Sequence, residues 1–342
     1  MKIGILTFHM AHNCGAMLQA FALCSFFNSF QDITCEIIDY RLSEIYKKYE
    51  DLLQQSYVEP RRLKFEQYLK EVLPISNRIS TLNNTNQYDL YVVGSDQVWN
   101  KTITRGYKDE YFAKKFPSNS FCVSYAASTG KKLDEPFDFV KKLDNFEFVS
   151  VRESWLQKEL AEHYPGKISL CLDPVFLINK KDWDLHIKNI KLNLSGYVLI
   201  YSFDITEDEY IRIEEWANKN KLIMIELITH KRTKRSTITY IDDYGPMEWI
   251  QYIKNASYIF TDSYHCSLFS IIYNIPFCCI SHGLGKNERT QDILKRLKLC
   301  QNKDEFYIFS NQTRLELNRE KTESFNFIKE VLNRVKDEKT NI

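Results

Sequence analysis

The sequence lacks several features that would by themselves indicate a class of partner. Lys and Arg number 46 against 45 Asp and Glu, a formal charge of +1 over 342 residues. No excess of charge would therefore attract the whole chain to nucleic acid or to an anionic membrane. No apolar run approaches the roughly 20 residues that a membrane-spanning helix needs. We expect no nucleic-acid partner and at most a peripheral contact with a membrane.

Signatures of specialised chemistry are also missing. The nine cysteines form no Cys-x-x-Cys pair, which is typical of reduced, buried thiols and favours a cytoplasmic protein, with peripheral contact at the inner face of a membrane at most. No His-Glu-x-x-His motif and no cluster of Cys and His ligands occurs, so we expect no metal. Gly-x-Ser-x-Gly and Gly-x-Gly-x-x-Gly are absent too, and neither a serine hydrolase nor a dinucleotide cofactor is indicated.

What the chain does contain is an alternation of short apolar strands and amphipathic helices. Strands are predicted at 2–8, 34–40, 90–94, 121–128, 148–152 and 168–172, and in a second series at 197–203, 222–228, 258–261 and 276–280. Helices are predicted at 16–30, 207–218, 246–255, 263–273, 287–297 and 320–336. Strands that are apolar on both faces are typical of a parallel sheet covered on both sides by helices.

A polar passage at 174–195 separates the two series, and 342 residues exceed the usual size of a single core. We predict an α/β protein with a Rossmann-like parallel-sheet domain at 1–178 and a second one at 196–310. A C-terminal helix within 311–342 would pack back on the first domain. Two facing sheets would bring their carboxyl edges to one cleft, the place where such folds bind ligands.

The most informative segment is TDSYHCSLFS, where a strand ends and a helix begins. Ser263, Tyr264 and His265 lie at this turn beside the free amides of a helix N-terminus, an arrangement suited to binding an anion. An alternative is equally open: Asp262 or Ser263 caps the helix, and His265 packs inside.

The segment VGSDQVWN also follows an apolar strand. Asp96 could take a proton from an acceptor hydroxyl, while Gln97, Trp99 and Asn100 could hold a sugar. In the alternative interpretation, Asp96 is a helix cap and Trp99 lies at the edge of the core.

Three further turns carry weaker signals. Gly15 permits close approach of the backbone to a ligand, and Asn13 can cap the helix that follows. Arg152 ends a strand and is suited to a carboxylate or phosphate, although a salt bridge to Glu153 is the alternative. Residues 282–289 place two glycines and two cations before a helix, either as an oxyanion platform or as a flexible loop.

Together, KIGILTFHMAHNCGAMLQAFAL, EIIDYR, VVGSDQVWN, SYAAS, SVRE, LDPVFL and TDSYHCSLFSIIYNIPF resemble the polysaccharide pyruvyl transferase family. The resemblance extends over about residues 2 to 300. It implies two facing Rossmann-like domains of the GT-B arrangement, with the acceptor on the first and the donor on the second. It also implies transfer of an enolpyruvyl unit from phosphoenolpyruvate to a sugar or lipid-linked oligosaccharide, giving a pyruvate ketal without a cofactor.

The resemblance suggests roles for individual residues. His265 would protonate the donor as a general acid, Asp96 would act as the base, and Arg152 would hold donor anions. The donor-binding residues would be Ser263, Tyr264, Lys286, Asn287 and Arg289. The acceptor-binding residues would be Asn13, Gly15, Ser95, Gln97, Trp99 and Asn100.

One departure from the family pattern stands out. Many members have Arg-Leu-His-Gly where this chain has Ser263-Tyr264-His265-Cys266, so one expected cation is missing. Two alternatives stay open: a nucleotide-sugar glycosyltransferase on the same architecture, and, because of the missing arginine, an inactive member that only binds a polysaccharide or a protein.

Overall fold

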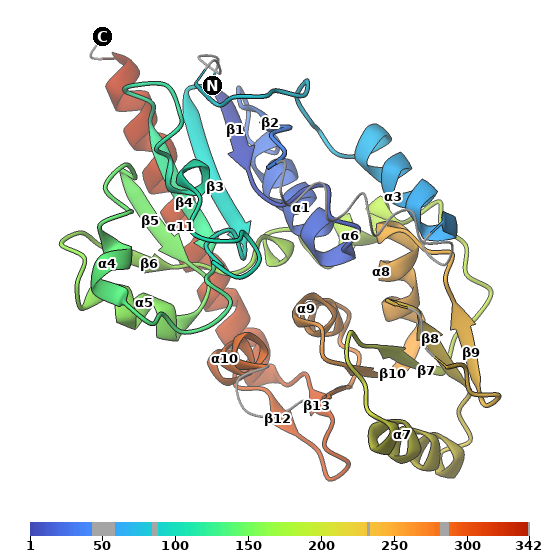
Figure 1. The fold of residues 1–342 in the computed structure, drawn as a ribbon. Coiled ribbons are helices and arrows are strands. Elements are labelled where there is room, and N and C mark those ends of the chain that lie inside the picture. Colours follow the sequence, from blue (N-terminus) through green and yellow to red (C-terminus); the bar gives the residue numbers. More distant parts are fainter. Residues whose placement is uncertain (43–58, 84–87, 231–232, 281–286, 341–342) are drawn as a thin grey trace.

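The computed structural model describes residues 1–42, 59–83, 88–230, 233–280 and 287–340. Its elements form two α/β units, one below the other in Figure 1, each built on a mainly parallel sheet. All strands predicted from the sequence are present, and the predicted fold class of two Rossmann-like domains is confirmed. The short strands β9, β12 and β13 were not predicted.

The first sheet has six parallel strands in the order β2-β1-β3-β4-β5-β6. The strands are β1 (Lys2–Leu6), β2 (Thr34–Ile37), β3 (Leu90–Asp96), β4 (Cys122–Ala127), β5 (Phe148–Val151) and β6 (Ile168–Leu170). The helices described in this half of the chain are α1 (Cys14–Asn28), α3 (Glu59–Glu71), η2 (Asp109–Phe112), α4 (Pro136–Val140), α5 (Ser154–Ala161), η3 (Pro174–Phe176) and α6 (Lys180–His186).

Alternation along the strands divides the first sheet between two cores. Leu90 and Val92 of β3 join the core under α1, whereas Tyr91 and Val93 join the core under η2, α4 and α5. This is the period of two that a pleated strand imposes on side chains that are buried on both faces.

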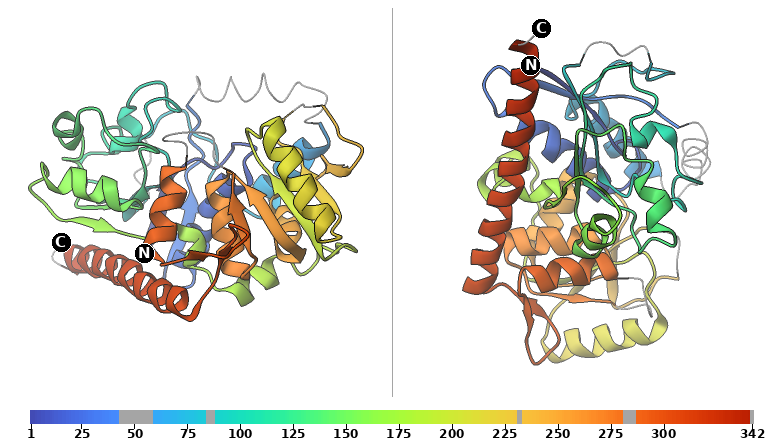
Figure 2. Two further views of the ribbon diagram at one scale, coloured as in Figure 1. Left: turned by 90° about the horizontal axis from the view of Figure 1, so that it is seen from below. Right: turned by 90° about the vertical axis from the view of Figure 1, so that its left-hand side faces the viewer.

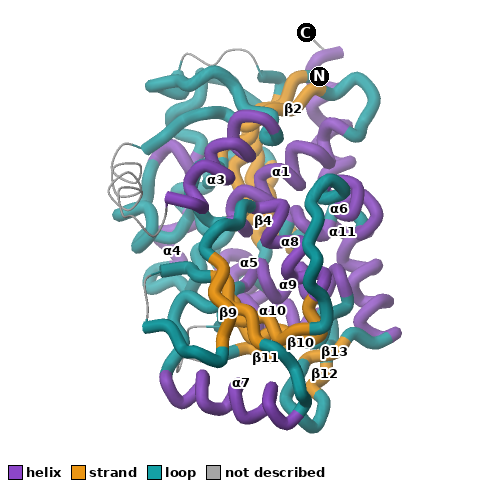
Figure 3. Tube along the Cα trace, turned by 90° about the vertical axis from the view of Figure 1, so that its right-hand side faces the viewer, coloured by secondary structure: helices purple, strands orange, loops and turns teal. Residues whose placement is uncertain are grey.

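The second sheet, as described, has seven strands in the order β12-β13-β11-β10-β7-β8-β9. β13 runs antiparallel to both of its neighbours, β11 and β12, and the other neighbouring pairs are parallel. The strands are β7 (Tyr197–Tyr201), β8 (Met224–Leu227), β9 (Ile238–Ile241), β10 (Ala256–Thr261), β11 (Phe277–Cys279), β12 (Cys300–Gln301) and β13 (Tyr307–Ile308). The helices are α7 (Glu207–Lys219), α8 (Pro246–Asn255), α9 (Tyr264–Tyr273), α10 (Glu288–Arg296) and α11 (Asn311–Thr340). Figure 3 shows α7 on the outer side of this sheet.

The two units share one hydrophobic core. The inner faces of both sheets, together with α1, α8 and α9, belong to a single cluster of buried side chains that includes Leu18, Trp183, Trp249 and Phe269. Because apolar burial is the main force that stabilises packing, this shared core holds the two domains against each other. The carboxyl edge of the first sheet therefore meets the N-terminus of α9.

Two helices cross between the units. Arg61 of α3 donates to the carbonyl of Ile228 at 2.7 Å and to the hydroxyl of Tyr244 at 2.9 Å, which anchors α3 on the second domain. The long α11 returns along the first sheet, with Phe327 against Tyr125, and its C-terminal end lies near the N-terminus of the chain (Figures 1 and 2). Of the helices within the described ranges, none has both the length and the apolar character needed to cross a bilayer.

The helix α10 is tied directly to the first domain. Asp292 accepts a hydrogen bond from the backbone N–H of Ser154 at 3.2 Å, so a carboxylate of the second domain caps the N-terminus of α5. Arg296 donates to the carbonyl of Arg152 at 2.6 Å and pairs with Glu320 of α11. These polar contacts fix the position of α10 beside the strand end that carries Arg152.

Candidate active site

Polar side chains from both domains meet where three strands of the first sheet end. Asp96 ends β3, Arg152 directly follows β5, and Asp173 follows β6. His265 arrives from the other domain, in the first turn of α9. Parallel strands end at a common edge, which is where ligands of α/β folds bind.

The centre of this cluster is the guanidinium of Arg152, whose side chain is 0% exposed. Its Nη1 donates to Asp173 at 2.7 Å, its Nε to Glu153 at 3.1 Å and its Nη2 to Asp96 at 3.3 Å. Three carboxylates therefore surround one buried cation. The sequence predicted that Arg152 would hold a donor anion, but its burial leaves no surface for a ligand, and the alternative of an ion pair with Glu153 is what the structure shows.

His265 lies between Asp173 and Gly15. Its Nε2 is 3.4 Å from the carboxylate of Asp173, an ion-pair distance, and it is buried without a hydrogen-bond partner in the described part of the chain. A Cβ added at Gly15 would lie 2.2 Å from Nδ1 of the imidazole. The absence of a side chain at Gly15 is therefore what lets α1 of one domain and α9 of the other approach this closely.

The pKa values of Asp173 and Glu153, the two carboxyl groups nearest to the guanidinium of Arg152, are shifted in opposite directions. Burial raises the pKa of the Asp173 carboxyl, but His265 and Arg152 outweigh burial and leave that pKa below its ordinary value. Burial dominates at Glu153, whose pKa is raised despite Arg152 and the hydrogen bond from Ser128. Its Oε2 is buried without a partner within the described residues.

Arg289 supplies a second cation at the same place. The ring centroid of Tyr264 lies 4.6 Å from the guanidinium of Arg152 and 5.2 Å from that of Arg289, within the range of cation–π contacts. Burial and the neighbouring Arg152 lower the pKa of Arg289. Among the described residues, no carboxylate forms an ion pair with Arg289. It is half-buried, so it can reach an anion that enters from the solvent.

Two of the predicted acceptor-binding residues lie in the core. Trp99 is 0% exposed, its ring stacks on Phe112 at 5.7 Å, and its Nε1 donates to the carbonyl of Tyr111. Ser95 is also 0% exposed and donates to the carbonyl of Ala126. Neither side chain has a surface to offer a sugar, so for both the structure corrects the prediction, and the core alternative holds for Trp99.

The other predicted residues mainly shape their own turns. Asn13 caps α1 and Ser263 caps α9, each through its side-chain oxygen. Gln97 and Asn100 hydrogen-bond to each other at 2.8 Å, and Asn287 donates to the carbonyl of Ile280 at 2.7 Å.

One predicted residue lies outside the described part of the chain, and one residue of the cluster was not predicted. Lys286 of the predicted donor set lies outside the described residues. Asp173 was not predicted to have a role, although it shows the same signal as Asp96, an acidic residue directly after an apolar strand.

Comparison with known proteins identifies the class. The family model for polysaccharide pyruvyl transferase matches residues 13–283. This match covers most of the chain, which therefore belongs to the polysaccharide pyruvyl transferase family. A search of curated proteins found no significant match.

Solved structures with the same architecture agree on the fold. The chain is similar to a UDP-N-acetylglucosamine 2-epimerase from Rickettsia bellii, with a TM-score of 0.54, 12% identity, and coverage of 98% of this chain and 97% of that one. It is also similar to the UDP-GlcNAc 2-epimerase from Neisseria meningitidis bound to UDP-GlcNAc, with a TM-score of 0.50, 11% identity, and coverage of 98% and 94%. At this identity the likeness shows the fold alone, which is the predicted GT-B arrangement.

The carboxylates that pair with Arg152 are not equally buried. We therefore expect their removal to lower the free energy of unfolding by different amounts. We expect Asp173→Asn to lower the free energy of unfolding by about 1.5 to 3 kcal/mol, because it weakens the shortest charge-assisted hydrogen bond to a fully buried guanidinium. The matched change Asp96→Asn should cost less, because that side chain is 10% exposed and its bond is longer. Urea unfolding followed by circular dichroism measures both, and equal losses at the two positions would contradict this account of the cluster.

Because Gly15 lies against the imidazole of His265, we expect the effect on stability of a substitution at Gly15 to depend on the residue at position 265. Gly15→Ala should lower the free energy of unfolding by about 1 to 3 kcal/mol, because the new methyl overlaps the imidazole. In a His265→Ala background the same change should be neutral or stabilising by about 0.5 to 1 kcal/mol, as is usual for Gly→Ala inside a helix. A double-mutant cycle measured by urea unfolding gives the coupling, and zero coupling would show that the two residues do not touch.

Proposed function

We propose that this protein transfers an enolpyruvyl unit from phosphoenolpyruvate to a sugar and forms a pyruvate ketal on a polysaccharide or its precursor. Membership of the pyruvyl transferase family supports the type of reaction. The observation that carries the proposal is the position of His265, a buried imidazole in the first turn of α9 that faces the charged edge of the opposite domain.

The donor is an anion, and the arrangement of the cluster suits it. Phosphoenolpyruvate carries a charge of about −3, from its phosphate and its carboxylate. In this cluster, Arg289 is a cation that has no carboxylate partner among the described residues, and the first amides of α9 have no acceptor inside the helix. Arg289 and this helix terminus would hold the donor. Arg152 would act indirectly, by holding the carboxylates of Asp96 and Asp173 in position. This division of roles also accounts for a serine at 263 where many members have an arginine.

The chemistry then follows from the positions of an acid and a base. His265 donates a proton to the methylene carbon of the donor, which leaves positive charge on the adjacent carbon. An acceptor hydroxyl bonds to that carbon as Asp96 takes the hydroxyl proton. Phosphate departs with the electron pair of its C–O bond and takes up the proton held by Asp96, which leaves the carbon cationic again. A second hydroxyl bonds to that carbon and returns its proton to His265, which closes the ketal. Asp173 keeps the imidazole oriented, because its carboxylate lies 3.4 Å from Nε2.

Removal of the imidazole tests the general acid. His265→Ala should lower the rate of phosphate release from phosphoenolpyruvate in the presence of acceptor by a factor of about 10² to 10⁴. His163→Ala is the matched control, because this histidine is exposed at the end of α5 and should leave the rate unchanged. Full activity in the His265 variant would remove this residue from the mechanism.

The base is tested by separating binding from turnover. Asp96→Asn should keep the binding of phosphoenolpyruvate, seen as an unchanged ligand-induced rise in melting temperature, and should lose turnover, because an amide cannot accept the hydroxyl proton. Weaker donor binding in this variant would assign Asp96 to the donor instead. A melting temperature raised by a UDP-sugar but not by phosphoenolpyruvate would favour a nucleotide-sugar transferase.

A further inference from the structure

Glu153 is a buried titratable residue that the proposed mechanism does not use. It directly follows Arg152 and is 1% exposed. It is the N-cap residue of α5, but its side chain forms no capping hydrogen bond to the described residues of this helix. Asp292 of α10 accepts from the backbone N–H of Ser154 in its place. The carboxyl group of Glu153 therefore does not gain the stabilisation of a helix N-terminus, and it faces Arg152 and Ser128 instead.

The two oxygens of the Glu153 carboxyl group have unequal surroundings. Oε1 accepts hydrogen bonds from the hydroxyl of Ser128 at 2.7 Å and from Nε of Arg152 at 3.1 Å. Oε2 is buried and has no hydrogen-bond partner in the part of the chain that the structure describes. An ionised carboxylate shares its charge between both oxygens, so the burial of one without a donor opposes ionisation. Oε2 is also the oxygen that can take up a proton without losing a hydrogen bond.

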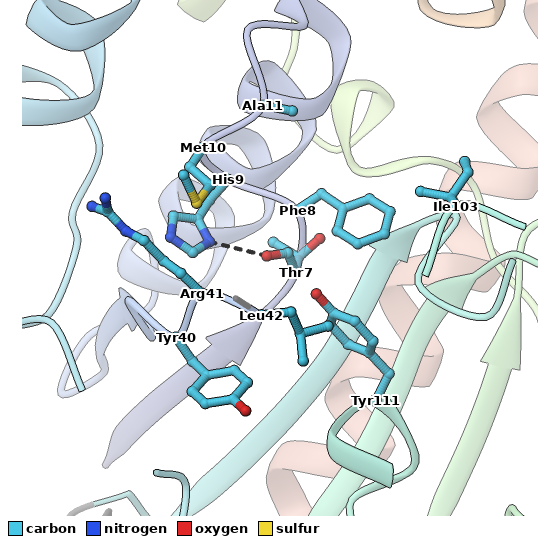
Figure 4. A pocket seen from close by; sticks show the side chains of 10 residues that line it. All are labelled: Thr7, Phe8, His9, Met10, Ala11, Tyr40, Arg41, Leu42, Ile103 and Tyr111. Atoms are coloured by element: carbon cyan, nitrogen blue, oxygen red, sulfur yellow. Dashed lines mark hydrogen bonds between the residues drawn. The ribbon is translucent and has the colours of Figure 1, made fainter. Parts of the chain in front are cut away.

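Asp39, at the same edge of the first sheet, shows the effect of a more complete set of donors on a buried carboxyl group. Figure 4 shows His9 and Arg41 in the wall of a pocket at the carboxyl end of β1, and both side chains bind this carboxylate. Arg41 donates to both oxygens, at 2.6 and 2.9 Å. Burial opposes ionisation of Asp39, but His9 and Arg41 outweigh it and lower its pKa to about 2. At Glu153 burial outweighs the hydrogen bonds, and the pKa is raised.

Glu153 also competes with two other acids for one cation. Arg152 pairs with Glu153, Asp96 and Asp173, so one guanidinium faces three carboxylates. Asp173 has further support, because it also accepts a backbone hydrogen bond and lies 3.4 Å from His265. Asp96 has contact with solvent, with its side chain 10% exposed. Carboxylates that share one cation repel one another, so the one with the least support takes up a proton first. In this cluster that acid is Glu153.

Arg289 connects Glu153 to the proposed donor site. Burial and Arg152 lower the pKa of Arg289, and Glu153 opposes this shift. At Glu153, Arg289 likewise opposes the rise in pKa that burial causes. The charges of these two residues therefore stabilise each other. Other charged or titratable side chains of the described elements also lie in or beside the Arg152 cluster: Asp96, Asp173, Tyr264, His265, Asp292 and Arg296.

A bound anion would change this balance in one direction. A donor phosphate on Arg289 would neutralise a cation that helps to ionise Glu153. It would also add negative charge beside a cluster in which carboxylates already outnumber the guanidinium. Both effects favour the neutral form of Glu153.

We propose that Glu153 adjusts the charge of the donor site, by taking up one proton from the solvent when the donor anion binds and releasing it when phosphate leaves. The proton adds to Oε2, and no other bond changes. The inference rests on the proposed function for the identity of the donor, and it adds a proton-linked control of donor affinity. Glu153 is not a catalytic residue, because it is buried and acts only through its charge on Arg152 and Arg289.

The proposal fixes the sign of a pH dependence. At a pH below the pKa of Glu153 in the free protein, the group is neutral before and after binding and does not affect donor affinity. As the pH rises through the higher pKa of Glu153 in the complex, its contribution to affinity is lost.

The test compares the wild type with Glu153→Gln, which has the shape of the protonated acid and cannot ionise. Calorimetry gives the Kd of phosphoenolpyruvate without acceptor between about pH 5 and pH 8. Pairs of phosphate-free buffers with different enthalpies of ionisation give the number of protons taken up. Inorganic phosphate is the second probe. Glu162→Gln is the matched control, because it makes the same change at an exposed residue at the end of the same helix.

We expect the ratio of the wild-type Kd to that of Glu153→Gln to rise from about 1 at pH 5 to about 10 at pH 8, since one unit of pKa shift on binding is a tenfold change in affinity. The wild type should take up more protons than Glu153→Gln, and Glu162→Gln should behave as the wild type does. The titration of the ligand itself cancels in this comparison.

A purely structural role of Glu153 would change Kd by the same factor at every pH. That result, equal proton uptake by the wild type and Glu153→Gln, or no binding of either anion would overturn the proposal. If Glu153→Gln does not fold, the infrared difference spectrum of the wild type decides. It should gain the C=O band of a protonated carboxyl group when phosphoenolpyruvate binds, and a spectrum without this band would overturn the proposal.

Phosphate release from phosphoenolpyruvate is measured separately, so that the two proposals can fail independently. Proton-linked binding through Glu153, without phosphate release for any acceptor, would leave the role of Glu153 standing and reject the proposed transfer. Phosphate release together with a ratio of Kd values that does not change with pH would keep the transfer and reject the role of Glu153.

Discussion

The buried guanidinium of Arg152 is the interaction on which the rest of the structure depends. One cation holds carboxylates from the ends of three strands, and a buried ion pair is stable only while its partners are all in place. Such a pair adds little net stability over an apolar core of the same size. Its effect is to fix positions, because Asp96 or Asp173 cannot move without losing a charge-assisted hydrogen bond to the buried guanidinium.

The second constraint is the closeness of the two domains. The shared hydrophobic core brings α1 and α9 together, and the missing side chain at Gly15 lets the imidazole of His265 reach Asp173. The contacts of Asp292 and Arg296 place α10, and with it Arg289, beside the same cluster. The result is a site built from both domains. A fixed negative cluster lies on one side, and on the other lie a helix N-terminus and Arg289, which has no carboxylate partner among the described residues.

Much of the fold could be predicted from periodicity and strand composition. The apolar strands and the helices α1, α7, α8, α9 and α10 were found because both domains bury their sheets on two faces, which leaves a strong pattern in the sequence. The helices α3, α4 and α6 were not predicted. The helix α8 was predicted with its observed ends, since Pro246 marks its start. The strands β12 and β13 have only two residues each, too few to show a period. The attachment of α3 to the second domain depends on Arg61 and Tyr244, which are far apart in sequence.

The sequence predicted which residues belong to the site better than it predicted the role of each residue. Acidic and basic residues at strand ends indicated Asp96 and Arg152, and the turn before α9 indicated His265. Burial could not be predicted, because it depends on which elements cover a residue. Trp99 therefore proved to be core, and Arg152 proved to position carboxylates. Asp173 was missed because its partners, Arg152 and His265, come from distant parts of the chain.

The central claim is that donor chemistry takes place between α9 and the Arg152 cluster. A crystal structure of the protein with phosphoenolpyruvate tests this claim most directly. The account predicts that the phosphate contacts Arg289 and the first amides of α9, with the methylene carbon facing His265. Phosphoenolpyruvate bound elsewhere, with His265 still packed against Gly15 and remote from the donor, would contradict it.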